Sequence, residues 1–336
     1  MITEVKSSLK LDVHIRIERE VFNFIFEDIR KLLEKINRSN LETLEEIRLR
    51  ANKPVMIINR SGDWFVDRDG KLSKNHVSSY GVRQWEIAKT LELMSENSIY
   101  AFQEDIRNGF ITLKGGHRVG VAGKAVMDGS SIKSIKDISG LNIRLSREVY
   151  GCSEKVIKHI INKNSVYNTL IISPPQCGKT TILRDVARVL SDGIDEYNFK
   201  GKKVGIIDER SEIAACYKGI PQNNVGVRTD VLDACPKRLG MSIMLRSMSP
   251  DVIITDEIGN DGDRDAVHKV INAGVKIITS AHGYNISELK SRQEVLSLIK
   301  ERVFERYIVL SNRQGPGTVE EVIDGISMKV RIGNDT

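Results

Sequence analysis

The spacing of apolar residues divides the chain into two halves. In the first half, residues 22–36 have apolar positions at helical spacing and predict an amphipathic helix. Shorter runs at 46–50 and 54–58 alternate between apolar and polar positions, which is typical of half-buried strands. A second helix is predicted over 85–94. We therefore expect residues 1–150 to form a small α+β domain.

A glycine-rich stretch, GGHRVGVAGKAV at 115–126, follows an apolar run at 109–113. Glycines punctuate strands because they adopt turn conformations that other residues avoid. The glycines at positions 115, 116, 120 and 123 therefore predict tight turns between strands in this part of the first domain.

The second half alternates between short apolar runs and helical patterns. A helix is predicted over 154–162. Apolar runs then occur at 166–172, 204–207, 252–255 and 275–279. Each run precedes polar or glycine residues and a helical pattern, which is typical of a mostly parallel sheet covered by helices on both faces. We expect an α/β domain over 151–336, with the boundary near Tyr150 and Gly151.

One segment of the second half has the pattern expected of a phosphate-binding loop. A buried strand, the loop SPPQCGKTT and a helix follow one another within 166–190, and we refer to 173–181 as the P-loop. Lys179 would supply a mobile cation for the β and γ phosphates, Thr180 would offer its hydroxyl to Mg²⁺, and Gly178 would allow close backbone approach. The predicted ATP-binding residues are Ser173, Pro174, Pro175, Gln176, Cys177, Gly178, Lys179, Thr180 and Thr181.

The P-loop departs from the common pattern at its first position. The pattern has glycine five residues before Gly178, where this chain has Ser173. We expect serine to make the turn with help from Pro174 and Pro175, at a cost in nucleotide affinity. A lone GKT is weak evidence by itself, and the alternative is an ordinary helix N-terminus.

An acidic pair ends the apolar run DVIITDEIG at 251–259. Ligands of open α/β sheets bind at the carboxyl ends of the strands. Asp256 would hold Mg²⁺ through its water shell, and Glu257 would orient and polarise the attacking water. The alternative is a solvated turn, but the position after a P-loop favours the hydrolytic pair.

Two further strands bring polar groups to the same rim. Residues 204–207 precede Asp208, Glu209 and Arg210, and residues 275–280 precede His282. Glu209 would assist Mg²⁺ or the water, and His282 would sense the γ-phosphate. The alternative for each is a capped or solvent-facing side chain.

Composition limits the remaining function classes. Apolar runs are far shorter than the ~20 residues of a transmembrane helix, and the N-terminus lacks a signal-peptide pattern, so we expect a cytosolic protein. The cysteines, at 152, 177, 216 and 235, form no CxxC pair and predict reduced thiols. A net charge of +6 and a pI near 9.0 weakly favour an anionic partner such as nucleic acid or an acidic membrane.

The order of these motifs resembles the type II and type IV secretion ATPase superfamily, whose members are hexameric RecA-like motors. The matching segments are a Walker A motif at 173–181, an aspartate box at 206–212, a Walker B motif at 244–259 and a histidine box at 279–285. The resemblance implies a RecA-like P-loop ATPase domain and a homo-oligomer that forms a ring.

Longer strings resemble one branch of this superfamily that acts in endospore formation. They lie at 45–57, 98–126, 141–151 and 224–259. The resemblance implies an ATPase on the mother-cell cytosolic side of a secretion-like channel to the forespore. Its partners would be membrane channel proteins, with peripheral membrane contact and no nucleic acid.

The resemblance also has departures and open assignments. The Gly-Glu of the secretion Walker B motif is Asp256-Glu257 here, and the four-cysteine zinc module of some members is absent. In this family, arginines of the N-terminal domain reach the nucleotide, which implies Arg144 and Arg147. Two further candidates lie inside the ATPase half, at Arg228 and Arg246. The alternative is that each arginine forms an ordinary ion pair.

Three other function classes remain open. A nucleic-acid-dependent ATPase would suit the basic pI but needs stacking aromatics, and aromatics make up only 5% of the chain. A nucleotide-binding scaffold would bind ATP without turnover. A small-molecule kinase would need an acceptor site, for which the sequence has no signature.

Overall fold

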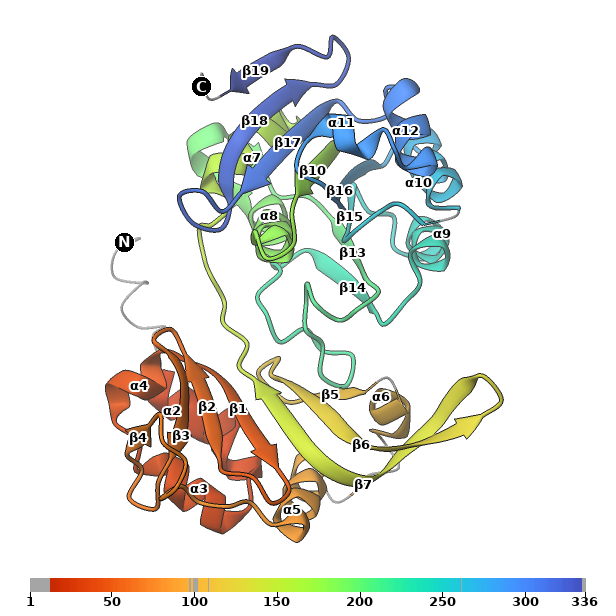
Figure 1. Ribbon diagram of the computed structural model, residues 1–336. Coiled ribbons are helices and arrows are strands. Elements are labelled where there is room, and N and C mark those ends of the chain that lie inside the picture. Colours follow the sequence, from red (N-terminus) through yellow and green to blue (C-terminus); the bar gives the residue numbers. More distant parts are fainter. Residues whose placement is uncertain (1–12, 97, 99–101, 108, 261, 334–336) are drawn as a thin grey trace. The chain divides into compact units, whose positions relative to one another are not determined.

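The computed structural model describes residues 13–96, 98, 102–107, 109–260 and 262–333 (Figure 1). The chain forms two compact units, Met1–Arg147 and Glu148–Thr336, so they separate three residues before the predicted boundary at Tyr150. Among the described residues, no helix is both long and apolar enough to span a bilayer.

The first unit is an antiparallel sheet with helices. The helices are α2 (Val13–Glu20), η1 (Phe22–Phe24), α3 (Glu27–Glu34), α4 (Arg38–Glu42), α5 (Gln84–Met94) and α6 (Gln103–Arg107). The strands are β1 (Leu44–Arg50), β2 (Met56–Asn59), β3 (Gly62–Val66), β4 (Leu72–Ser73), β5 (Phe110–Thr112), β6 (Arg118–Asp128) and β7 (Ser131–Arg144). Their order in the sheet is β4-β3-β2-β1-β7-β6-β5. This unit therefore has the predicted α+β character.

The single helix predicted over 22–36 is wrong. The segment forms the short helix η1 and then α3, because Ile25 has an extended backbone between them. The amide of Phe26 donates to Thr90 Oγ1 at 3.1 Å, and its ring packs edge-on against Trp85. These contacts with α5 fix the break, and the spacing of apolar residues does not reveal them.

The turns predicted at Gly120 and Gly123 are also wrong. Both residues lie inside the continuous strand β6, whereas Gly115 and Gly116 do form a turn, with φ of 89° and 79°. The register of β6 against β7 shifts between Ala122 and Lys124. A Cβ at Gly123 would lie 2.6 Å from the Lys136 carbonyl oxygen, so glycine here permits a β-bulge.

Acid should destabilise the first unit through Glu20. Burial raises the pKa of this carboxyl, but hydrogen bonds from His117, Arg16 and Arg19 outweigh burial and lower the pKa from 4.5 to about 2. The ionised form is therefore stabilising above pH 4.5, and this contribution disappears as the pH falls towards 2, a loss of up to about 3 kcal/mol.

Urea unfolding at pH 5 and pH 3 tests this expectation. Trp64 and Trp85 both belong to the first unit, so tryptophan fluorescence reports its unfolding. Glu20→Gln should reduce the difference between the two pH values, and Glu18→Gln on the same helix serves as the control. An equal pH dependence in wild type and Glu20→Gln would contradict the assignment.

The second unit contains the larger sheet. Its helices are α7 (Glu154–Ile160), α8 (Lys179–Asp192), η3 (Asp195–Tyr197), α9 (Lys237–Ser247), α10 (Asp263–Asn272), α11 (Ile286–Leu289) and α12 (Gln293–Lys300). Its main strands are β10 (Thr169–Ser173), β13 (Val204–Asp208), β14 (Thr229–Asp233), β15 (Val252–Thr255), β16 (Lys276–His282), β17 (Arg306–Ser311), β18 (Thr318–Asp324) and β19 (Val330–Gly333). Two small ribbons complete it, β8 (Ile161–Asn162) with β9 (Ser165–Val166) and β11 (Gly193–Ile194) with β12 (Phe199–Lys200).

The main sheet has the order β14-β13-β15-β16-β10-β17-β18-β19. The pairings from β14 to β17 are parallel, and those of β17 with β18 and β18 with β19 are antiparallel. The predicted mostly parallel sheet is therefore confirmed. The expected alternation of strands and helices to the end of the chain is wrong, because β14 follows β13 without a helix and β17–β19 form a meander.

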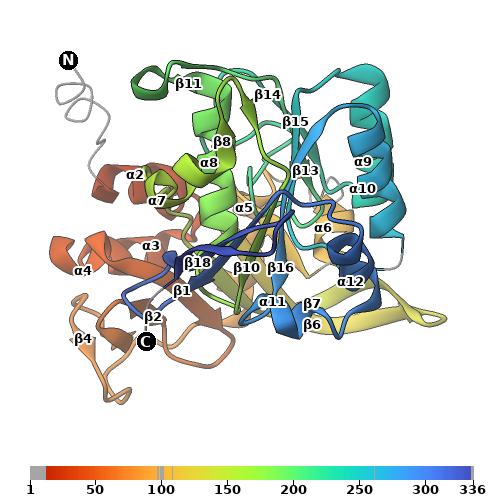
Figure 2. The same cartoon turned by 90° about the horizontal axis from the view of Figure 1, so that it is seen from above.

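Helices cover both faces of this sheet, as predicted (Figure 2). Successive strand residues point to opposite faces, so Ile171 joins one apolar cluster with residues of α7 and α8, while Leu170 and Ile172 join the other with residues of α9, α10 and α12. Both faces of the sheet are covered by apolar side chains, which explains the uninterrupted apolar runs of the sequence. The helices thus hold the strand ends, and the loops that follow them, in fixed positions.

Candidate functional site

The predicted site residues of the second unit gather at one edge of the sheet. Strands β10, β15 and β16 are parallel neighbours, and Ser173 is paired with His282 while Thr255 is paired with Thr279. The segments that follow these strands therefore leave the sheet at the same edge. This edge carries the P-loop, the acidic pair and His282.

The backbone of the P-loop explains why serine replaces the first glycine. Left-handed conformations occur at Gln176 (φ 62°) and Gly178 (φ 81°), but not at Ser173. Ser173 is the buried last residue of β10, and its carbonyl accepts from the amide of Gly283 at 3.2 Å. Because its φ is that of an ordinary strand residue, a Cβ is compatible with the loop. Ser173 is therefore compatible with the turn, as expected, and the expected cost in nucleotide affinity stays a prediction.

Lys179 begins α8 and is buried. Its Nζ lies 3.3 Å from the carbonyl oxygens of Ser173 and Pro174 and 2.9 Å from His282 Nδ1. It forms no ion pair within the described part of the chain, and burial lowers the pKa of its ammonium group while Asp256 and Glu257 oppose the shift. A buried cation held by neutral groups is well suited to receive an anion.

Thr180 and Asp256 meet as the sequence predicts. Thr180 Oγ1 donates to Asp256 Oδ2 at 2.9 Å. The other carboxylate oxygen, Oδ1, accepts from the backbone amide of Glu257 at 2.9 Å and from the hydroxyl of Ser280. These bonds orient the carboxylate towards Thr180. Ser280 was not predicted as a site residue, although its place two residues before His282 on β16 was a usable signal.

Glu257 follows Asp256 in an unusual backbone conformation. Its φ is 38°, and its amide also donates to Ser280 Oγ at 3.1 Å. The side chain is partly exposed, with Oε2 3.2 Å from Arg210 Nη1 and Oε1 3.5 Å from His282 Nε2. Left-handed backbone at a non-glycine residue concentrates at functional sites, because it requires surrounding contacts to hold it.

His282 connects the lysine with the acidic pair. An ammonium group only donates hydrogen bonds, so Nδ1 of His282 must accept from Lys179. In the neutral imidazole the proton is then on Nε2, which faces Glu257. The ring therefore links Lys179 to Glu257, and its role as a sensor of the γ-phosphate stays a prediction.

Glu209 has a different partner from the one expected. Its carboxylate pairs with Lys237 at the start of α9. The neighbouring Asp208 is buried, accepts from the amides of Glu212 and Ala214 at 2.8 Å each, and has a pKa raised by burial. Asp208 thus shapes the loop after β13. A direct role of Glu209 in the site remains a prediction.

The four arginine candidates do not join the P-loop residues within the second unit. Arg228 precedes β14 and donates to the Ser191 carbonyl at 2.8 Å, and Arg246 lies in the last turn of α9. Both positions are at the amino ends of parallel strands, which is the edge of the sheet opposite the P-loop. The prediction that either arginine acts at this chain's own P-loop is therefore wrong. Arg144 and Arg147 belong to the first unit, where Arg147 donates to the Leu44 carbonyl at 2.7 Å, and their role stays a prediction.

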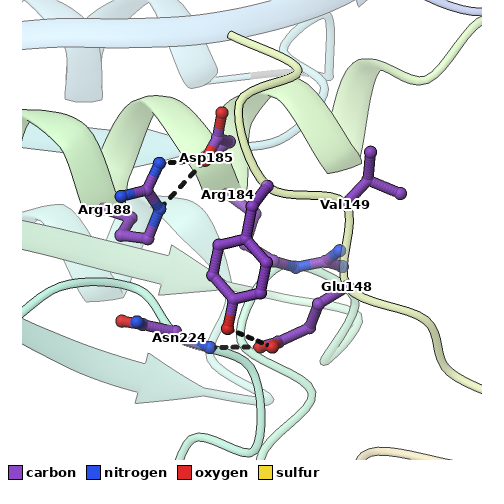
Figure 3. A pocket seen from close by; sticks show the side chains of 7 residues that line it. Glu148, Val149, Arg184, Asp185, Arg188 and Asn224 are labelled. Carbon is purple, nitrogen blue, oxygen red and sulfur yellow. Dashed lines mark hydrogen bonds and ion pairs between the residues drawn. The ribbon is translucent and has the colours of Figure 1, made fainter. Parts of the chain in front are cut away.

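A small pocket lies beside α8, away from the P-loop (Figure 3). It is lined by Glu148, Val149, Tyr150, Arg184, Asp185, Arg188 and Asn224. Its volume of about 10 Å³ suits one water molecule and no nucleotide. Glu148 accepts from the amide of Asn224, and Asp185 accepts from Ser153 N at 2.9 Å and Ser153 Oγ at 2.7 Å. The first contact fastens Glu148 to the segment before β14, and the other two fasten Ser153 to α8.

The chain is similar to known proteins in both sequence and structure. The family model for sporulation stage III, protein AA, matches residues 16–330. Stage III sporulation protein AA of Bacillus subtilis (strain 168) is 42% identical over 305 residues, which cover 91% of this chain and 94% of that protein. The protein SEEDLING PLASTID DEVELOPMENT 1 of Arabidopsis thaliana is 25% identical over 311 residues, covering 88% of this chain and 40% of that protein.

Two solved structures of the ATPase DotB have a similar fold. The Legionella pneumophila structure has a TM-score of 0.52 at 13% identity and covers 84% of this chain and 77% of its own. The Yersinia pseudotuberculosis structure has a TM-score of 0.54 at 10% identity and covers 84% and 76%. These similarities confirm the predicted fold class, a RecA-like P-loop domain preceded by a smaller N-terminal domain. From the family match and the identity to the Bacillus subtilis protein, the chain belongs to the sporulation stage III protein AA family.

Proposed function

We propose that this chain binds ATP with Mg²⁺ and hydrolyses it to ADP and phosphate. The observation that supports the proposal most strongly is one connected network at the carboxyl edge of the sheet. In it Lys179 contacts His282, His282 faces Glu257, and Thr180 contacts Asp256. A cation, a hydroxyl, two carboxylates and an imidazole at one strand-loop-helix are the groups that phosphoryl transfer from ATP to water requires.

The residues fit a magnesium nucleotide. The Thr180 hydroxyl and the Asp256 carboxylate are hard oxygen ligands of the kind Mg²⁺ prefers, and they already lie 2.9 Å apart. When bound, Mg²⁺ neutralises charge on the phosphate oxygens. Lys179 would exchange its carbonyl and imidazole partners for phosphate oxygens, which relieves the cost of its burial.

Glu257 is the proposed general base. Its carboxylate is partly exposed and is steadied on one side by Arg210 and on the other by His282. A water held against it would attack the γ-phosphorus as the bond to the β-phosphate oxygen breaks, and Glu257 would accept the proton. When Lys179 moves to the phosphates, His282 loses its Nδ1 partner, so the imidazole can report whether the γ-phosphate is present.

We further propose that hydrolysis drives a secretion-like channel between mother cell and forespore, with the chain acting as a homo-oligomer, a hexameric ring, at the mother-cell side. Membership of the sporulation stage III protein AA family and the fold shared with the ATPase DotB support this role. Membrane channel proteins are the proposed partners, with peripheral membrane contact. Light scattering with and without a nonhydrolysable ATP analogue tests the oligomer, and a monomer in both conditions would contradict it.

The contribution of Thr180 can be measured through the magnesium dependence of phosphate release. Thr180→Ala removes one oxygen ligand, so the Mg²⁺ concentration at half-maximal rate should rise about tenfold, the worth of one hydrogen-bond-sized interaction of about 1.4 kcal/mol. Thr180→Ser keeps the hydroxyl and should restore the wild-type dependence. Unchanged magnesium dependence in Thr180→Ala would remove the residue from the metal site.

A further inference from the structure

The site residues define a direction for the bound triphosphate, if the proposed function holds. Glu257 and His282, which would meet the γ-phosphate, follow β15 and β16 on one side of β10. Strand β17 is the neighbour of β10 on its other side. A triphosphate whose γ end faces β15 and β16 therefore directs its nucleoside towards β17.

One loop stands beside the P-loop on that side. Residues 312–317, the 312–317 loop, connect β17 to β18. The amide of Gly317 donates to the carbonyl of Cys177 in the P-loop at 3.0 Å, and Pro316 would touch a Cβ at Gly178 at 3.5 Å. The 312–317 loop and the P-loop are thus in direct contact, at the point where the P-loop leads into α8.

The 312–317 loop has a defined shape. The amide of Gly315 donates to the Asn312 carbonyl at 3.0 Å, the amide of Gln314 donates to Thr318 Oγ1 at 3.2 Å, and this hydroxyl donates to the Gly315 carbonyl at 2.7 Å. A loop that is held in this way loses little conformational entropy when a ligand binds. The backbone of this loop is therefore ordered in advance of binding.

Two of those side chains have the chemistry to recognise a base. Asn312 and Gln314 are exposed and end in amides. An amide can accept a hydrogen bond from the adenine amino group and donate one to the adjacent ring nitrogen, so it distinguishes adenine from guanine. We propose that the 312–317 loop is the adenine-recognition element of this ATPase, with Asn312 and Gln314 as its specificity-determining residues.

Calorimetric titration of the full chain with three ligands tests the proposal. The ligands are ATP, GTP and inorganic tripolyphosphate, each with Mg²⁺. The double variant Asn312→Ala/Gln314→Ala should bind ATP about tenfold more weakly, because it loses hydrogen bonds to the base but none to the phosphates. Its affinities for tripolyphosphate and GTP should equal those of the wild type. Asn272→Ala, an exposed amide at the end of α10 and at the opposite sheet edge, is the matched control and should change none of them.

The outcomes separate this proposal from the proposed function. If the double variant binds ATP as the wild type does, while Lys179→Ala fails to bind it, the adenine assignment falls and the ATPase stands. If tripolyphosphate binding weakens with ATP binding, the 312–317 loop acts on the phosphates and the assignment to the base is overturned. If the wild type binds no ATP, the proposed function itself falls.

Discussion

Lys179→Ala should abolish ATP turnover and strongly weaken ATP binding. Lys179 is the buried cation at the start of α8, and its contacts are two carbonyl oxygens and His282. Removing one charged donor that stabilises developing phosphate charge costs about 10²–10³-fold in rate. The folded state should not suffer, because the variant no longer buries an ammonium group without an anion. Phosphate release and calorimetric ATP titration measure the two effects.

A second lysine provides the control for this variant. Lys276 begins β16, the strand that ends at His282, and it pairs with Glu305 at the far edge of the sheet. Lys276→Ala should leave ATP binding and turnover within about twofold of wild type, because its partly exposed ion pair lies at the sheet edge opposite the P-loop. Sporulation that proceeds normally with Lys179→Ala would contradict the motor role even if turnover is lost.

Glu257→Gln should retain ATP while losing hydrolysis. The amide preserves the size of the side chain but cannot accept the proton of the attacking water, so the rate of phosphate release should fall about 10²–10⁴-fold. ATP affinity should change little, because the phosphates are held by the P-loop. The expected signature is a stable ATP complex, measured by chromatographing bound nucleotide after incubation with ATP and Mg²⁺.

Glu209→Gln separates the roles of the two glutamates. Glu209 also follows a strand of the same sheet, but its carboxylate is paired with Lys237. This variant should lose less of the phosphate-release activity than Glu257→Gln, because an assisting carboxylate contributes less than the general base. Equal losses in both variants would mean that the loop after β13 supplies the base or its support. An unchanged rate in Glu257→Gln would leave the chain as a nucleotide-binding scaffold.

The sequence was informative wherever chemistry depends on neighbours along the chain. GKT before a helix, and Asp-Glu after an apolar strand, identified residues that the fold brings within hydrogen-bond distance, as Thr180 and Asp256 show. The parallel sheet followed from apolar runs that are buried on both faces. In contrast, the turns assigned to Gly120 and Gly123 failed because a glycine required by a β-bulge looks the same in sequence as one required by a turn.

Residues that act through contacts distant in sequence were missed. Ser280 orients Asp256 from the neighbouring strand, and the 312–317 loop reaches the P-loop from more than a hundred residues further along the chain. Arg228 and Arg246 are candidates by residue type and by their place in the ATPase half. The direction of β14 and α9 places both residues at the edge of the sheet opposite the P-loop, and the periodicity of apolar residues does not reveal that direction.

The hydrogen bonds between Ser153 and Asp185 attach the start of the second unit to α8. The same helix has Lys179 and Thr180 in its first turn and Asp185 about two turns later. Asp185 accepts hydrogen bonds from the amide and the hydroxyl of Ser153. A helix of 14 residues behaves as a nearly inextensible rod about 21 Å long. A displacement of its first turn on the proposed release of phosphate would therefore also displace Ser153, the sixth residue after the first unit.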